Sequence, residues 1–274
     1  MRRTVALVVV ALLVAAVAGC GAVNKGTAFA GEFQRLLDDR ENVVDSSISA
    51  SNNLPWSGTA SVSVTLADDL NDSEIVEEVW EITAQEVDNQ IAYSLQVDVE
   101  AENADGGPAR TQFAFRVRAP APDDDGLRDD IADRLDRARA LAALGSGETS
   151  VEAFSGRTTL TTQADALTIA GEVCSDEQLA DLVETFSVSG VLPTGEASAV
   201  TFNDADDCDW LVDAREVLDA LGTVTVVAGY DATRQVHQAQ PRLRVSVPGA
   251  QALDLTAAET TASRLGLTLE VVSV

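Results

Sequence analysis

An order of secondary-structure elements that occurs twice along the chain does most to limit its fold. Segments in which apolar and polar residues alternate predict strands, and segments in which apolar residues recur every three or four positions predict helices. Between residues 59 and 163, and again between 197 and 273, these segments follow the order β-α-β-β-α-β. We therefore expect an α+β fold of two ferredoxin-like sandwich units, each an antiparallel sheet with helices on one face.

The same pattern sets the expected bounds of the elements. The first unit should span residues 29–163 and the second residues 164–274. Strands are expected at 43–51, 59–66, 91–99, from Phe113, near 149–154 or 157–163, and at 166–173, 197–203, 223–228, 242–247 and 267–273. Helices are expected from Phe29, from the capping box Asn71-x-x-Glu74, at 124–143, after Ser175, at 209–221 and from Thr256.

The first 20 residues have the pattern of an export signal. Two arginines precede an apolar run from Val5 to Ala18, and small residues follow it. The residues Val17-Ala18-Gly19-Cys20 resemble the lipobox of bacterial lipoproteins. The resemblance implies cleavage between Gly19 and Cys20, which makes 1–19 a signal peptide and 20–28 a short tether. It also implies a diacylglycerol on Cys20, with palmitate-like acyl chains, and a place on the extracytoplasmic face of the cell membrane.

Two other interpretations of this segment stay open. An ordinary secreted protein would lose the same signal without gaining a lipid. A membrane-spanning helix needs roughly 20 apolar residues, which is more than the run offers. If the lipid is present, two or three acyl chains on one cysteine hold the protein on the membrane stably, whereas one chain does so only marginally.

Cys174 and Cys208 are the only cysteines after Cys20. An even pair in an exported protein predicts a disulfide. The chain-entropy treatment gives a cross-link of this loop length a stabilisation of about 3–4 kcal/mol. A metal site is the alternative, but it needs more Cys or His ligands, and His237 is the only histidine in the chain.

The chain is strongly acidic, with 45 Asp and Glu against 18 Lys and Arg and a formal net charge of −27. Such a charge repels nucleic acid and anionic lipid headgroups, and it attracts divalent cations or a basic protein partner. Solubility is the simpler explanation of the same charge. The apolar content of 46% is enough for a core, which should be aliphatic because only 4% of residues are aromatic.

One acidic cluster lies on the helix expected after Asn71. Glu74, Glu77, Glu78 and Glu81 share one face of that helix, within a stretch from Glu41 to Pro108 that has no basic residue. Three interpretations stay open. Arginines of helix 124–143 lie beside the face, or water solvates it, or it is a surface for a partner or a cation.

A second acidic cluster comprises Asp204, Asp206, Asp207 and Asp209. Oxygen-rich loops of this kind bind Ca²⁺, although this one lacks the glycine and the distal glutamate of an EF-hand loop. Acidic residues at a helix start also stabilise the helix without a metal. The sequence therefore offers these four residues as calcium ligands or as a helix start.

The motifs of the common hydrolases are missing from the sequence. It has no G-x-S-x-G segment, its only lysine is Lys25 in the expected tether, and zinc motifs need several histidines. These absences favour a binding protein over an enzyme. A pair of carboxylates stays open as a catalytic group, because 45 acids make close pairs inevitable.

Residues 160–203 resemble the BON modules of bacterial envelope proteins, through the strand expected at Leu167–Val173 and the helix after it. Together with the lipobox, the resemblance implies a lipid-anchored envelope protein. We expect a non-enzymatic binding or scaffolding module that needs no cofactor beyond its lipid. A carboxylate-dependent cell-wall enzyme and a solute-binding lipoprotein are the alternatives.

Overall fold

A computed structural model gives the structure of the chain. It describes residues 25–54, 57–118, 125–154, 156–180, 185–203, 208–250 and 253–274. Gly19, Cys20 and three of the aspartates, Asp204, Asp206 and Asp207, lie outside these ranges, so their expected roles stay predictions. In the described ranges, no helix has both the length and the apolar character needed to cross a membrane.

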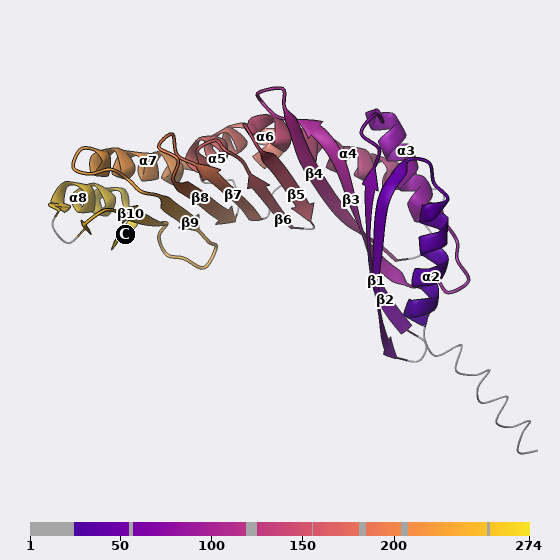
Figure 1. Cartoon of the computed structure of the whole chain (residues 1–274). Coiled ribbons are helices and arrows are strands. Elements are labelled where there is room, and N and C mark those ends of the chain that lie inside the picture. Colours follow the sequence, from indigo (N-terminus) through magenta and orange to yellow (C-terminus); the bar gives the residue numbers. More distant parts are fainter. Residues whose placement is uncertain are drawn as a thin grey trace, which may run out of the picture. The chain divides into compact units, whose positions relative to one another are not determined.

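Pairs of strands alternate with helical connections along the chain (Figure 1). The elements are α2 (Lys25–Asp38), β1 (Val43–Leu54), β2 (Ser57–Leu66), α3 (Asp72–Ala84), β3 (Ala92–Glu102), β4 (Pro108–Val117), α4 (Asp125–Leu144), β5 (Thr149–Phe154), β6 (Arg157–Thr161), α5 (Ala166–Ser175), α6 (Glu177–Ala180), β7 (Thr185–Val191), β8 (Ala197–Asn203), α7 (Asp209–Gly222), β9 (Tyr230–Arg234), β10 (Arg242–Val247), α8 (Thr256–Leu265) and β11 (Thr268–Ser273).

The described strands belong to one mixed sheet, in which their spatial order follows the sequence from β1 to β11. The pairs β1–β2, β5–β6, β7–β8 and β9–β10 are antiparallel hairpins. The pairs β2–β3, β4–β5, β6–β7, β8–β9 and β10–β11 are parallel, and a helical segment connects the two strands of each. The chain therefore has both helices and strands, as expected.

This strand order corrects the prediction of two ferredoxin-like, antiparallel sandwich units. A fully antiparallel sheet of this element order requires each helix to connect strands that are not neighbours. Here each helical segment after β1 connects adjacent strands, which are then parallel, as in a βαβ unit. The hydrophobic pattern fixes the element order, but it does not say whether a connection skips a strand.

Contacts divide the chain into two compact units. Unit 1 comprises the described residues up to Val99 together with Ala114–Asp133, and unit 2 comprises Glu100–Phe113 together with Arg134–Val274. The division describes where contacts are dense. The predicted division into one unit at 29–163 and another at 164–274 stays a prediction.

The core of unit 1 includes a cluster of three aromatic rings in mutual contact. Phe29 and Phe33 on α2 lie 5.0 Å apart between centroids, and Tyr93 on β3 lies 5.4 Å from the first and 5.2 Å from the second. Alternation along β2 buries Val62, Val64 and Leu66. This packing fixes α2 against the start of the sheet.

In unit 2 the sheet has a buried apolar face and a polar face. Leu160, Val188, Val200 and Ala232 lie in register across four strands and are fully buried. Thr159, Ser187, Thr201 and Thr233 form the adjacent row on the other face. Helices α5 and α7 contact each other and cover the apolar face (Figure 1). Hydroxyl side chains therefore line the side of the sheet opposite the helices.

Two strand predictions in unit 2 are wrong. Residues 166–173 form helix α5, because Ala166, Ile169, Ala170 and Val173 recur at helical spacing and all pack into the core. The strand expected at 223–228 is instead the loop before β9, which begins at Tyr230.

Candidate functional site: the acidic face of helix α3

Helix α3 begins at the predicted capping box. The Asn71 side chain accepts a hydrogen bond from the backbone N–H of Glu74 at 3.2 Å, and the Glu74 carboxylate accepts one from the backbone N–H of Asn71 at 2.9 Å. Ile75, Val79 and Ile82 are buried against the core. The Glu74 carboxylate is therefore already hydrogen-bonded at the start of the helix. Glu77, Glu78 and Glu81 lie beside the face of the helix that Ile75, Val79 and Ile82 bury.

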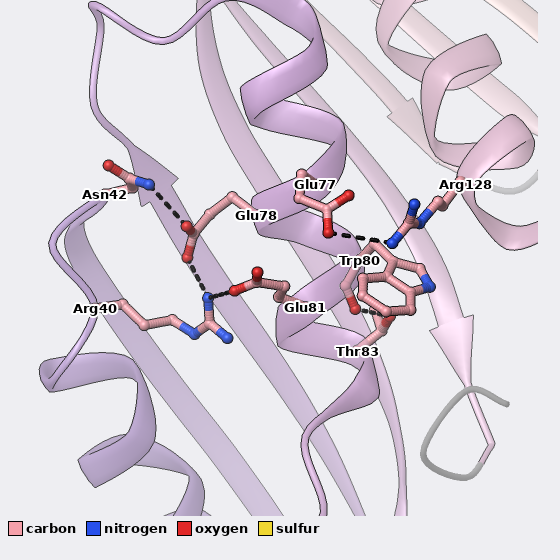
Figure 2. Close-up of polar contacts among 8 residues, drawn as sticks. All are labelled: Arg40, Asn42, Glu77, Glu78, Trp80, Glu81, Thr83 and Arg128. Carbon is pink, nitrogen blue, oxygen red and sulfur yellow. Dashed lines mark hydrogen bonds and ion pairs between the residues drawn. The ribbon is translucent and has the colours of Figure 1, made fainter. Parts of the chain in front are cut away.

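Glu78 is a nearly buried carboxylate with both oxygens satisfied (Figure 2). It is 8% exposed. Arg40 donates from Nη1 to Glu78 Oε1 at 2.6 Å, and Asn42 donates from Nδ2 to Oε2 at 2.8 Å. The same Arg40 nitrogen lies 3.1 Å from Glu81. Charge-assisted bonds of this length offset much of the free energy of removing a carboxylate from water.

Glu77 pairs with a different arginine. Arg128 on α4 donates from Nη2 to Glu77 at 3.1 Å, and its guanidinium carbon lies 4.0 Å from the centroid of the Trp80 ring (Figure 2). The ion pair is well exposed and worth little by itself. Stacking of the guanidinium on the indole adds a cation–π contact that keeps α4 beside α3.

Two arginines of unit 1 thus offset part of the charge of the acidic face. Arg128 belongs to the helix whose arginines were expected beside these glutamates, whereas Arg40, from the connection between α2 and β1, was not predicted. The carboxylates of Glu77, Glu78 and Glu81 all contact an arginine. The geometry can stabilise the junction of three elements, and a role as a surface for a partner or cation stays a prediction.

Of the proposed calcium ligands, only Asp209 is described. It is exposed and is the first residue of α7, directly after the N-cap residue Cys208. Throughout the described ranges, no group of three or more His, Cys, Asp or Glu side chains could hold a metal ion. Asp209 has the position in which an acid favours a helix start without a metal.

A disulfide joins Cys174 and Cys208 in the structure, with their Cα atoms 6.2 Å apart. Cys208 precedes α7, and Cys174 lies in the last turn of α5, shortly before the short helix α6. The bond therefore connects the end of one helix to the start of the next long helix. It encloses α6, β7 and β8 in a covalent loop.

A polar cluster around Asp165 was not predicted. Asp165, directly before α5, accepts hydrogen bonds from the Tyr230 hydroxyl on β9, from Arg215 on α7 and from Thr168. The Tyr230 oxygen accepts a bond from the backbone N–H of Leu167 at 2.9 Å. Arg215 and Tyr230 lie 50 and 65 residues from Asp165, so only the fold brings these three together.

The cluster shifts the pKa values of two of its members. Burial alone would raise the pKa of Asp165, but hydrogen bonds from Tyr230 and Arg215 and the charge of Arg215 outweigh it and hold that pKa below its usual value. Burial, followed by the hydrogen bond and charge of Asp165, raises the pKa of Tyr230. Both shifts favour ionised Asp165 beside neutral Tyr230, which is the state that holds the cluster together.

His237 is exposed in the turn between β9 and β10, where it has the position of a surface histidine.

Comparison with known proteins found no relative: no family model, no curated protein and no solved structure matches the chain. Its function must therefore be argued from its own residues.

Proposed function

We propose that this protein is a lipid-anchored binding or scaffolding module on the extracytoplasmic face of a cell membrane. The observation that carries the proposal is the sequence Val17-Ala18-Gly19-Cys20 after an apolar run. A diacylated cysteine at this point would hold the folded chain near the bilayer, because few residues separate Cys20 from α2, which begins at Lys25 rather than after the predicted tether at 20–28. Two acyl chains are sufficient for stable anchoring.

Three features of the structure support this proposal. The disulfide between Cys174 and Cys208 suits an oxidising compartment outside the cytoplasm. The acidic face of α3 is occupied by structural ion pairs with Arg40 and Arg128, so its carboxylates serve packing rather than catalysis. The row of hydroxyl side chains on the face of the unit 2 sheet opposite the helices suits contact with another macromolecule.

The test compares the full-length protein with the variant Cys20→Ser in cells. The native protein should pellet with membranes after a wash that strips peripheral proteins, and its mature N-terminus should be Cys20 with added diacylglyceryl mass. The variant should leave the membrane fraction. Val23→Ser is the matched control, because it introduces a serine close to the anchor without removing Cys20 or either cysteine of the disulfide. A native protein that retains Met1 and carries no lipid would contradict the proposal.

A further inference from the structure

Strand β11 is an open edge of the sheet in unit 2. Within the described chain it pairs with β10 only, in an unbroken parallel register from Arg242↔Thr268 to Val247↔Ser273. Strand β1, the first strand of the sheet, is different: it has register shifts near both ends and contacts α2 along its length. Register shifts, prolines, lysines and covering elements commonly prevent an edge strand from pairing with another chain. Strand β11 has no register shift, no proline and no lysine.

The side chains of β11 that face the helices have a neighbouring strand, β10, on one side only. On β10, Leu243, Val245 and Val247 are fully buried. On β11, Leu269 and Val271 pack against the same core but remain only partly buried. The apolar layer therefore continues to β11 and ends there with side chains that one more strand would cover.

A hollow of about 330 Å³ lies beside this edge. Its apolar lining includes Ala262, Leu267 and Leu269, and its polar lining includes Gln240, Glu259 and Ser263. On α8, Arg264 bonds Glu216 of α7, whereas Glu259 and Ser263 lie on a different flank by helical periodicity. Among the described residues, no ion pair neutralises the exposed Glu259 carboxylate.

We infer that β11 binds an extended segment of a basic partner protein, which adds to the sheet as a strand and places a Lys or Arg side chain in the hollow. A long basic side chain suits this hollow because its aliphatic stem covers Leu267 and Leu269 while its charge reaches Glu259. Backbone hydrogen bonds to β11 supply the rest of the contact, as in other strand-addition complexes. This inference names a partner for the binding role proposed above and rests on it.

The structure also favours one orientation and one kind of partner. Strands β5, β7 and β9 each have a parallel neighbour on one side and an antiparallel neighbour on the other, so the added strand should run antiparallel to β11. A second copy of this chain is a poor occupant, because each copy has a formal charge of −27 and the two would repel.

The first experiment tethers a probe strand to the full chain. A Gly-Ser linker after Val274 carries the strand Thr-Val-Thr-Lys-Thr-Val-Thr, so that its effective concentration is high. Amide hydrogen exchange of residues 268–273 should slow about tenfold at alternate positions. With Glu259→Gln, the protection should fall about threefold for this strand but not for a strand with Met in place of Lys. Glu172→Gln, an exposed glutamate on α5, is the matched control and should change neither.

Unchanged exchange in β11 would overturn the inference, as would an equal effect of Glu259→Gln on the Lys and Met strands. In cells, a photoreactive residue at Ser273 should crosslink to a Lys- or Arg-containing segment of another protein, and one at Thr161 should not. Crosslinks only to this chain, or none above the Thr161 control, would overturn the partner assignment. Failure of these tests with intact lipid on Cys20 rejects strand addition alone, whereas loss of the anchor rejects the proposed function.

Discussion

Tyr230 on β9 donates its hydroxyl hydrogen to Asp165, 65 residues earlier in the chain, and accepts one from the backbone N–H of Leu167. The two bonds connect the sheet to the start of α5. Arg215 on α7 bonds the same carboxylate, so three elements of unit 2 meet at Asp165. Because each group is partly or wholly buried, loss of one partner leaves another polar atom unsatisfied.

The substitution Tyr230→Phe should lower the free energy of unfolding by about 1–3 kcal/mol, because the Leu167 N–H and the Asp165 carboxylate lose a partner. Tyr93→Phe is the matched control. Tyr93 is 2% exposed, and its hydroxyl has no hydrogen-bond partner within the described residues, so removing it should leave stability equal or higher. Urea denaturation of both variants measures the difference. Equal losses would show that ring packing, not the hydroxyl, matters at residue 230.

The depressed pKa of Asp165 predicts an acid-sensitive contribution to stability. A carboxyl whose folded pKa lies below its unfolded value of about 3.8 stabilises the fold above that value and loses this contribution as the pH falls through the folded pKa. The native protein should therefore lose stability below about pH 4 more steeply than Asp165→Asn. Thermal unfolding followed by circular dichroism from pH 7 to pH 2 tests this. Parallel curves for the two proteins would reject a lowered pKa.

Substitution of Arg40 should show how much the buried ion pair between Arg40 and Glu78 contributes to the free energy of unfolding. Arg40→Met leaves the Glu78 carboxylate with Asn42 as its one side-chain partner among the described residues, and we expect the free energy of unfolding to fall by up to about 3 kcal/mol. The double variant Arg40→Met/Glu78→Gln should recover part of the loss, since the amide is neutral. Arg35→Met, an exposed arginine on α2, should change stability by less than about 0.5 kcal/mol. A loss at Arg40 no greater than at Arg35 would mean that the pair is solvated.

Two glycines should respond in opposite directions to alanine. Gly190 lies on β7 where an added Cβ would overlap the carbonyl oxygen of Ala164, so Gly190→Ala should destabilise the protein by about 1–3 kcal/mol. Gly171 lies inside α5 with no atom close to the added Cβ, so Gly171→Ala should stabilise it by about 0.5–1 kcal/mol. Chemical denaturation of both variants tests the pair. A tolerated alanine at 190 would show that the loop at Ala164 moves away freely.

Reduction of the disulfide should lower the melting temperature. The cross-link spans a sequence separation of 34 residues, for which loop-closure entropy predicts a stabilisation of about 3–4 kcal/mol. The double variant Cys174→Ser/Cys208→Ser should show the same loss and should no longer respond to reductant. A native midpoint that does not move with reductant, together with two titratable thiols, would reject the bond.

Local signals in the sequence predicted most elements of the fold. The capping box at Asn71 marked the start of α3, and strict alternation placed β10 at residues 242–247, as observed. The error at residues 166–173 arose because Leu167, Ile169 and Gly171 alternate with polar or small residues, as in a strand. The helical spacing of Ile169, Ala170 and Val173 was also present, and packing against β7 and β8 decides between the two.

The strand order and the polar sites depend on information that a local pattern does not hold. The prediction that arginines of helix 124–143 lie beside the glutamates holds for Arg128. It does not include Arg40, which is 38 residues from Glu78 in the sequence. Nothing near Asp165 in the sequence points to Tyr230. Pairings of this kind follow from which strands become neighbours, and the element order alone permits several arrangements.

The sequential strand order has a consequence for how this chain can change. Each strand bonds to the strands beside it in the sequence, so formation of the sheet requires few encounters between distant segments, and such topologies fold comparatively fast. A block of one helix and two strands can be inserted or deleted without changing how the other strands pair, as in repeat arrays. Homologous chains of this architecture should therefore differ in length by whole blocks rather than by single strands.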